Sequence, residues 1–335
     1  MALSSPVVLV LRALGLGDLL TAVPALRGIR RALPGHRVVL ATPAPLAPLA
    51  LLSGAVDEVL DARGLEPLAG RCAPPAVAVD LHGRGPQSHR VLQAARPGRL
   101  VAFGCAEAGV AGPPWREGEW EVARWCRLVR DGLGGEPDED ELRLPAPEAE
   151  PPVDGAVVVH PGAAFASRRW PSERFAAVAR TLAVAGERVV VTGTGEEVPL
   201  ARQVAGLAGL PSDSVLAGRT DVEEMAALVA AARLVVCGDT GTAHLASAFL
   251  TPSVVLFGPV SPAAWGPPPG RPQHVAVEEG AGSGDPWGDR PDPALLRITV
   301  PRVVGAARAL LNASGQSRSR SREPPPRASA IEARR

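Results

Sequence analysis

Short runs of consecutive apolar residues alternate along the chain with stretches in which apolar residues recur at helical spacing. The first run, residues 6–11 (PVVLVL), is typical of a strand buried on both faces. Residues 19–33 then carry apolar side chains at helical spacing, Pro34 and Gly35 end that pattern, and a strand is predicted at residues 38–41. A strand, a glycine turn, a helix and a strand form a βαβ unit, which requires a parallel sheet.

The same alternation continues along the chain in two series. We predict strands at residues 56–60, 76–81 and 99–103 and a helix at 120–133, followed by a linker rich in Pro, Glu and Asp at 134–152. The second series contains predicted strands at 156–160, 188–192, 234–237 and 253–257 and predicted helices near 172–185, 198–208, 222–232, 242–249 and 301–311.

This pattern predicts an α/β fold with two domains that face each other across a cleft. The first comprises residues 1–150, including most of the linker, and the second comprises residues 151–312. Residues 313–335 are rich in Ser, Arg and Pro and have no apolar periodicity, so we predict a disordered, solvated tail.

Composition supports two folded domains and argues against a nucleic-acid partner. The chain has 335 residues, of which 46% are hydrophobic and 21% charged, as in globular proteins. All 35 basic residues are arginines, and 35 acidic residues balance them. No overall field attracts a polyanion, so we expect no nucleic-acid partner.

Cysteine spacing indicates whether zinc or redox sites are present, and hydropathy indicates whether the chain crosses a membrane. No CxxC pair occurs, so neither a zinc site nor a redox motif is predicted, and we expect free thiols at Cys72, Cys105, Cys126 and Cys237. The N-terminus lacks the charged region of a signal peptide, and no apolar run reaches the roughly 18 residues of a membrane span. We therefore predict a cytoplasmic protein, or one that binds peripherally to a membrane.

The first candidate site residue is Asp18, which follows the first predicted strand in the sequence Gly15-Leu16-Gly17-Asp18. In an open parallel sheet, ligands bind at the carboxyl ends of the strands, so this carboxylate is expected to project towards the cleft. Alternatively, Asp18 caps the helix that follows. The glycines do not complete a GxGxxG fingerprint, which argues against a dinucleotide site.

A second candidate follows the first strand of the second series. His160 ends that strand, a glycine loop follows, and Arg168 and Arg169 precede a helix that starts near Pro171. Arginines beside a helix start suit a phosphate group because they offer charge and bidentate hydrogen bonds. The alternative is two solvated arginines beside the core residue Trp170.

A third candidate is the segment CGDTGTAHLA at residues 237–246. A buried strand turns through glycines into a helix, whose free N-terminal amides can hold an anion such as pyrophosphate. The alternative assigns structural roles to the polar side chains, with Asp239 as a helix cap and His244 packed against the inner face.

Taken together, four segments resemble the heptosyltransferases, glycosyltransferase family 9, which include ADP-heptose:lipopolysaccharide heptosyltransferases. The segments are LRALGLGDLLTAVPALRGIRRALP, HPGAAFASRRWPSERFAAVA, TGTGEEVPLA and DTGTAHLASAFLTPSVVLFGPVSPAAWGP, in the family's order. The resemblance implies a GT-B architecture, in which two Rossmann-like domains bind the acceptor and the nucleotide sugar respectively.

The resemblance also implies roles for particular residues. Asp18 matches the family's catalytic base, and Arg168 stands where the family commonly has a lysine on the donor phosphates. Glu197 matches an acidic residue that contacts the nucleoside. The donor-site segment is matched by Asp239, Thr240, Gly241 and His244. Residues 80–84 form a candidate acceptor-binding loop in a region where the family varies most, and His82 and Arg84 are its candidate contacts. One departure is Trp120, where related sequences often have a histidine.

The implied function is inverting, metal-independent transfer of a sugar, expected to be heptose, from an ADP-sugar to a hydroxyl of a glycan or glycolipid, without a cofactor. Adenine selectivity is expected near residues 220–225. The acidic run Asp138-Glu139-Asp140 lies in the linker and is expected to be solvated. The alternatives are an NAD-dependent oxidoreductase and an inactive sugar-nucleotide-binding protein. The acceptor stays open among a lipid-anchored core sugar at the inner membrane surface, a cell-wall glycan and a small natural product.

Overall fold

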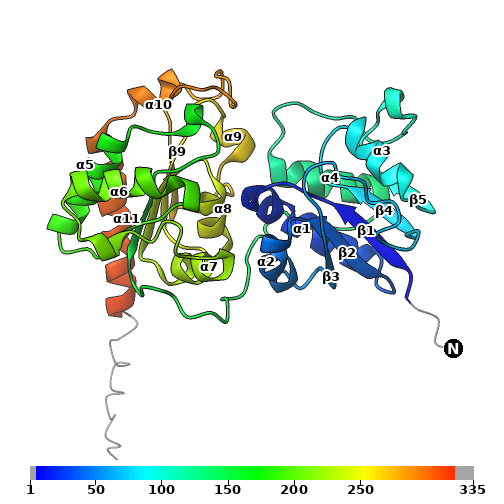
Figure 1. The fold of residues 1–335 in the computed structure, drawn as a ribbon, viewed down its shortest axis with the longest axis horizontal. Helices are drawn as coiled ribbons and strands as arrows, with labels where there is room; N and C mark the ends of the chain where they lie inside the picture. Colours follow the sequence, from blue (N-terminus) through cyan, green and yellow to red (C-terminus); the bar gives the residue numbers. More distant parts are fainter. Residues whose placement is uncertain (1–4, 321–335) are drawn as a thin grey trace, which may run out of the picture.

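The computed structural model describes residues 5–320 and contains two parallel five-stranded sheets, which lie side by side in Figure 1. The first has the order β3-β2-β1-β4-β5 and the second the order β10-β9-β8-β6-β7. The first sheet consists of β1 (Val7–Leu11), β2 (Arg37–Thr42), β3 (Glu58–Asp61), β4 (Val77–Asp80) and β5 (Arg99–Val101). The second consists of β6 (Val157–His160), β7 (Val189–Val191), β8 (Leu234–Gly238), β9 (Ser253–Leu256) and β10 (His274–Val277).

Helices join successive strands in each half, except that a loop without a helix joins β3 to β4. The first half contains α1 (Leu16–Ala32), α2 (Ala47–Leu52), α3 (Gln87–Ala94) and α4 (Glu121–Leu133). The second half contains α5 (Ser172–Val184), α6 (Val198–Ala208), α7 (Val222–Ala231), α8 (Gly241–Ala248), α9 (Pro262–Trp265), α10 (Pro293–Arg297) and α11 (Val300–Arg320). The predicted α/β class is confirmed.

Both sheets are covered on both faces, which explains their continuous apolar strands. In β1, Val8 and Val10 pack into one core, and Leu9 and Leu11 pack into another on the opposite face. The core that contains Val8 continues through α1 and α8 to Val158 of β6, so one apolar cluster joins the two halves.

The helices α1 and α8 approach closely where the two halves meet (Figure 1). A Cβ atom placed on Gly241 would lie 2.9 Å from the Cβ of Leu16. A Cβ atom placed on Gly17 would lie 2.7 Å from Cδ2 of His244. Glycine at both positions thus permits this close approach, because a side chain at Gly17 would displace the His244 ring and one at Gly241 would displace Leu16.

Some elements differ from those predicted. The short elements α2, α3, α9, α10 and β10 were not predicted from the sequence. The helix predicted to end at residue 311 continues to Arg320, so the predicted disorder does not hold for residues 313–320, while residues 321–335 lie outside the described part. No proline interrupts this stretch before position 324, and its Ala, Gln and Arg residues favour helix, whereas its Ser and Gly residues do not.

The predicted linker has no regular secondary structure and packs against both halves. Residues 134–156 contain no helix or strand, and this linker contacts both halves: Arg27 Nη1 donates to the carbonyl of Glu141, and the Leu144 amide donates to the carbonyl of Ala248.

The four cysteines are free thiols, as expected. Within residues 5–320, no helix combines the length and the apolar character that crossing a membrane requires.

Candidate active site

A cavity of about 1000 Å³ lies where the two halves meet, at the carboxyl ends of parallel strands from both sheets. The first half contributes the loop after β1 and the start of α1. The second half contributes the loops after β6, β7 and β8. The polar side chains that line the cavity include Asp18, His160, Arg168, Glu197, Asp239, Thr240 and His244. The structure thus brings seven of the sequence-predicted residues together.

Asp18 lies in the first turn of α1, which begins at Leu16 rather than after Asp18. Its Oδ2 accepts from the amide of Gly15 at 3.1 Å, and its Oδ1 lies 3.4 Å from Nη2 of Arg12. The carboxylate therefore helps to hold the helix start without being its N-cap, and 27% of the side chain stays exposed. Asp18 is thus both fixed in position and accessible from the cavity.

Across the cavity, the start of α8 presents its free backbone amides. Thr240 is the N-cap residue, and its side chain forms no capping hydrogen bond to the helix. Asp239 is buried, and its Oδ2 lies 3.3 Å from Nη1 of Arg168. Burial raises the pKa of Asp239, and the charges of Arg168 and His244 partly oppose this rise. The Nε of Arg168 has no hydrogen-bond partner in the structure. A helix start beside an incompletely bonded arginine is suited to an anion.

Glu197 lies beside the glycine loop after β6. Its Oε2 accepts from the amide of Thr194 at 2.8 Å. A Cβ atom on Gly162 would lie 2.2 Å from the carboxyl carbon of Glu197, so only glycine leaves room for this carboxylate. Nearby, Nδ1 of His160 lies 3.0 Å from Oγ1 of Thr192, and burial lowers the pKa of His160.

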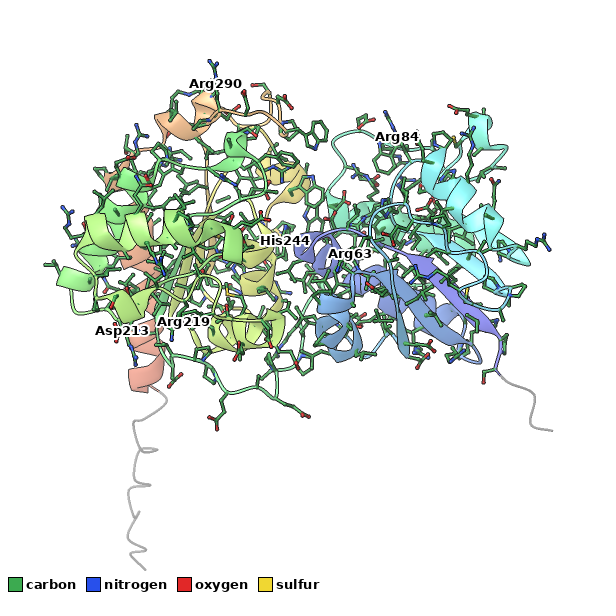
Figure 2. The ribbon with its side chains drawn as sticks, in the orientation of Figure 1. Arg63, Arg84, Asp213, Arg219, His244 and Arg290 are labelled. Carbon is green, nitrogen blue, oxygen red and sulfur yellow. The ribbon has the colours of Figure 1, made fainter. Side chains whose placement is uncertain are left out.

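Residues that the sequence analysis did not single out also line the cavity. The aromatic ones are Phe165, Trp265 and Trp287. Trp265 packs edge-on against His244, with ring centroids 6.1 Å apart, whereas Trp287 is 69% exposed. Figure 2 shows His244 between the two halves. Phe165 and Trp287 lie in loops and Trp265 ends the short helix α9, so none belongs to a periodic pattern that would identify it as a site residue.

The candidate acceptor residues His82 and Arg84 have different surroundings. The amide of His82 donates to Oδ1 of Asp80, and burial together with Arg12 lowers the pKa of His82 to about 4, although Asp18 opposes this shift. His82 is therefore close enough to Asp18 to feel its charge. Arg84 is exposed and pairs with Glu117 at 2.9 Å (Figure 2). Neither His82 nor Arg84 lines the cavity.

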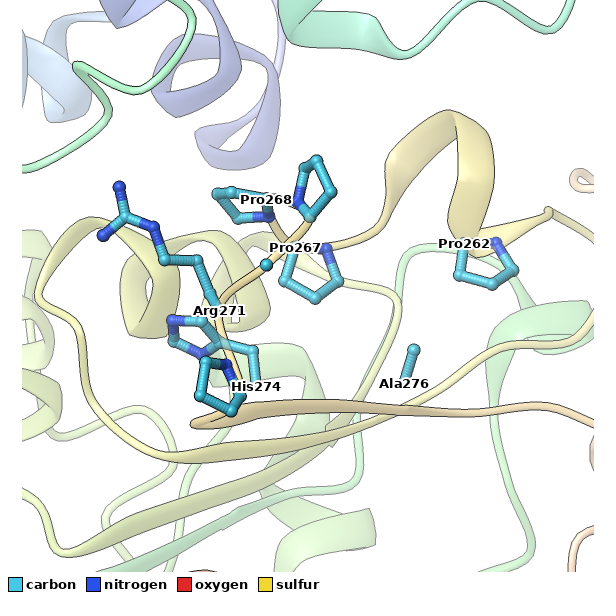
Figure 3. A pocket seen from close by; sticks show the side chains of 9 residues that line it. Pro262, Pro267, Pro268, Arg271, His274 and Ala276 are labelled. Carbon is cyan, nitrogen blue, oxygen red and sulfur yellow. The ribbon is translucent and has the colours of Figure 1, made fainter.

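A second hollow of about 580 Å³ lies on the second half, beside β10 and the proline-rich segment 267–272 (Figure 3). Its polar residues are Arg271 and His274. Nδ1 of His274 lies 2.9 Å from Oγ of Ser253, and burial and Arg271 lower the pKa of His274 to about 4. This hollow contains no carboxylate, so the candidate site for proton transfer is the cavity between the halves.

Within residues 5–320, no group of three or more His, Cys, Asp or Glu side chains is arranged to hold a metal ion. In the linker run at residues 138–140, Asp140 is 76% exposed and lies 3.6 Å from Arg271. This run does not line the cavity.

Comparison with solved structures identifies the architecture. The fold is similar to that of the ADP-heptose lipopolysaccharide heptosyltransferase II of Escherichia coli, with a TM-score of 0.73, 20% identity, and coverage of 92% of this chain and 99% of that one. It is also similar to the E. coli heptosyltransferase WaaC with ADP, with a TM-score of 0.68, 19% identity, and coverage of 91% and 99%. The GT-B architecture expected from the sequence is therefore confirmed.

Sequence comparison gives the family. The chain is 36% identical over 108 residues to the lipopolysaccharide heptosyltransferase 2 of Salmonella typhimurium, and this match spans 30% of either chain. The family model for glycosyltransferase family 9 (heptosyltransferase) matches residues 116–283, half of the chain. That range includes the Arg168, Glu197 and Asp239–His244 positions of the cavity. The chain belongs to glycosyltransferase family 9, the heptosyltransferase family.

Proposed function

We propose that the protein is an inverting glycosyltransferase that transfers a heptose from ADP-heptose to a hydroxyl of a glycan or glycolipid. The single observation that carries this proposal is the placement of Asp18 in one cavity with Arg168, Glu197 and the start of α8. A carboxylate held by the first half thus faces anion-binding groups of the second half. The names of the similar proteins, lipopolysaccharide heptosyltransferases and a heptosyltransferase with ADP, support this donor and an acceptor of the lipopolysaccharide class.

The donor is assigned to the second half. Arg168 and the free amides at Thr240 and Gly241 would hold the diphosphate, because a guanidinium and a helix N-terminus both favour negative charge. Glu197 would accept hydrogen bonds from ribose hydroxyls, and the adenine would lie near residues 220–225, four of which line the cavity. The Asp239 carboxylate would accept from hydroxyls of the transferred sugar.

Asp18 is assigned as the general base. It would take the proton of the acceptor hydroxyl while that oxygen attacks the anomeric carbon from the face opposite the diphosphate. The bond from the anomeric carbon to the phosphate oxygen breaks, and ADP leaves with the electron pair. Arg168 and the α8 amides would stabilise the charge that grows on ADP. Metal-independent transfer follows if these groups supply all of that stabilisation.

Substitution of Asp18 tests the assignment. Asp18→Asn should lower kcat by roughly 100-fold or more while leaving ADP affinity nearly unchanged, because only the proton acceptor is lost. The measurement is ADP release from ADP-heptose with truncated lipopolysaccharide acceptors, together with ADP titration by calorimetry. The matched control is Asp213→Asn, since Asp213 lies on the far side of the second half (Figure 2). Near-normal turnover by Asp18→Asn would remove Asp18 from the mechanism.

The rival functions have distinct outcomes in the same assay. An inactive sugar-nucleotide-binding protein would bind ADP-heptose and turn over no acceptor. No observation favours an NAD-dependent oxidoreductase, because the glycine pattern after β1 is incomplete and the chain belongs to a glycosyltransferase family.

A further inference from the structure

A buried guanidinium lies directly beside the candidate base. The side chain of Arg12, which follows β1, is 1% exposed. Its Nε donates to the carbonyl oxygen of Asp18 at 2.9 Å, and its Nη2 lies 3.4 Å from Oδ1 of the same residue. Nη1 donates to the carbonyl oxygen of Leu81, and the guanidinium stacks on Trp125 with its central carbon 4.6 Å from the ring centroid. Arg12 therefore fixes Asp18 to the end of β4 and to α4.

The same guanidinium has a second carboxylate partner. Nη2 of Arg12 lies 3.1 Å from Oε1 of Glu121, whose side chain is only 4% exposed. Oε1 of Glu121 also accepts from Nε1 of Trp125 at 2.8 Å, and Oε2 accepts from Arg124. One nitrogen of Arg12 is thus shared between a carboxylate that is open to the cavity and one that is enclosed by donors.

This sharing matters during proton transfer. A buried charge without a partner is costly, and losing one member of a buried ion pair typically destabilises a protein strongly. If Asp18 were the only counter-ion of Arg12, each proton uptake by Asp18 would leave that cation uncompensated. Glu121 is enclosed, and it contacts Arg12 through Oε1 and Arg124 through Oε2, so Arg12 keeps a carboxylate contact in both protonation states of Asp18.

We propose that Arg12 and Glu121 are positioning residues that form a buried charge pair, orient Asp18 and keep Arg12 compensated when Asp18 takes up a proton. The role of Asp18 as base rests on the proposed function, whereas the effect of the pair on its protonation can be measured without it. No bond in the pair breaks: the proton moves from the acceptor hydroxyl to Asp18, and the charges of Arg12 and Glu121 are unchanged.

The other titratable groups around Asp18 are identified by their electrostatic coupling to it. They come from the end of β4 and from the β8 to α8 turn and are His82, Asp239 and His244. Burial lowers the pKa values of both histidines, so they are neutral at neutral pH. Asp239 has its own cation in Arg168, 3.3 Å away. Arg12 is therefore the charged side chain that contacts Asp18 directly, and Glu121 is the carboxylate that contacts Arg12.

Carbon-13 NMR of the full chain, labelled at the aspartate carboxyl carbons, tests the proposal. The Asp18 resonance is assigned by its disappearance in Asp18→Asn, and its titration midpoint is then compared among variants. In Glu121→Gln, Arg12 no longer has a second counter-ion, so the Asp18 midpoint should fall by about one pH unit. In Arg12→Gln, the midpoint should rise by a similar amount.

Opposite shifts distinguish this electrostatic role from a general loosening of the structure around Asp18. Such loosening would move the Asp18 midpoint in the same direction in both variants. Arg12→Lys keeps the charge and should return the midpoint to near the wild-type value. Arg12→Met, which also removes the charge and should raise the midpoint, replaces Arg12→Gln if the latter does not fold. The matched control is Glu119→Gln, because Glu119 pairs with Arg127 rather than with Arg12. Unmoved midpoints, or shifts of the same sign, would overturn the proposal.

The activity measurement separates failure of this proposal from failure of the proposed function. If Asp18→Asn turns over normally, Asp18 is not the base, although its midpoint can still move in the variants. If Asp18→Asn is inactive but Glu121→Gln leaves the midpoint unchanged, the charge pair is disproved and the base assignment survives.

Discussion

The two sides of the cavity are built in different ways. On the first half, one carboxylate is held by a network of buried charges, with Arg12 bonded to Asp18 and Glu121. On the second half, close backbone packing prepares the site: Gly162 leaves room for Glu197, and Gly241 lets the start of α8 approach Leu16. A proton acceptor needs a controlled charge, whereas a diphosphate site needs free amides and space, so the difference follows from the chemistry expected on each side.

Both halves also bury histidines. Protonation of these histidines predicts the largest expected effect, a loss of folding stability at acidic pH. Burial lowers the pKa of each of these histidines, namely His82 and His89 in the first half and His160, His244 and His274 in the second. An unfolded histidine binds a proton below pH about 6.5. The folded state binds it only at lower pH, so the stabilisation present above pH 6.5 is lost as the pH falls towards about 4.

Buried carboxyls act in the opposite direction. Burial raises the pKa of Asp80 to about 6, so Asp80 costs stability as the pH rises from about 4 to 6, and Asp239 has the same sign. With three histidines against two, the second half should lose more stability on acidification. Urea unfolding at pH 7 and pH 5, with hydrogen exchange resolved by half, measures this. His274→Asn should reduce the loss, and equal stability at both pH values would contradict the assignment.

The second prediction concerns the junction of the two sides. Gly241→Ala places a methyl group 2.9 Å from Cβ of Leu16, so α8 and α1 must separate. A displacement near 1 Å between Asp18 and the α8 amides should lower kcat by roughly 100-fold. Gly206→Ala in α6 is the matched control, because nothing lies within 4 Å of the added atom, and it should not lower stability. Normal turnover by Gly241→Ala would show that the spacing of the two sides is not critical.

The comparison also shows what could be predicted from sequence. The second side was identified well, because strand, glycine loop and helix start are local patterns, and Arg168, Glu197 and Asp239 line the cavity as expected. The first side was identified only at Asp18. Arg12 and Glu121 are 109 positions apart, so nothing local links them. Arg84, a predicted acceptor contact, is exposed, pairs with Glu117 and does not line the cavity, so its role stays a prediction.

The third prediction isolates the charge on the second side. Arg168→Gln should weaken ADP binding by about 10- to 30-fold, since hydrogen bonds to charged groups contribute about 1.5–3 kcal/mol each. Adenosine has no phosphates, so its affinity should stay unchanged. Arg168→Lys should retain most of the ADP affinity, and Arg308→Gln is the matched control, because Arg308 is exposed on α11 and does not line the cavity. An equal loss of adenosine binding would assign Arg168 a structural role through Asp239 instead.

The smallest expected effect is the selectivity of the site for the adenine of the nucleotide. Glu197 can accept from ribose hydroxyls of any nucleotide, so selectivity must come from the part of the cavity lined by Thr220, Asp221, Val222 and Met225. ADP should bind at least about 10-fold more tightly than UDP or GDP, a difference of about 1.4 kcal/mol that one or two base-specific hydrogen bonds can supply. Calorimetry of the three nucleotides in one buffer measures this. Tighter binding of UDP or GDP would end the heptose assignment and leave the two-sided transferase site intact, because Asp18, Arg168 and the α8 amides do not contact the base in this proposal.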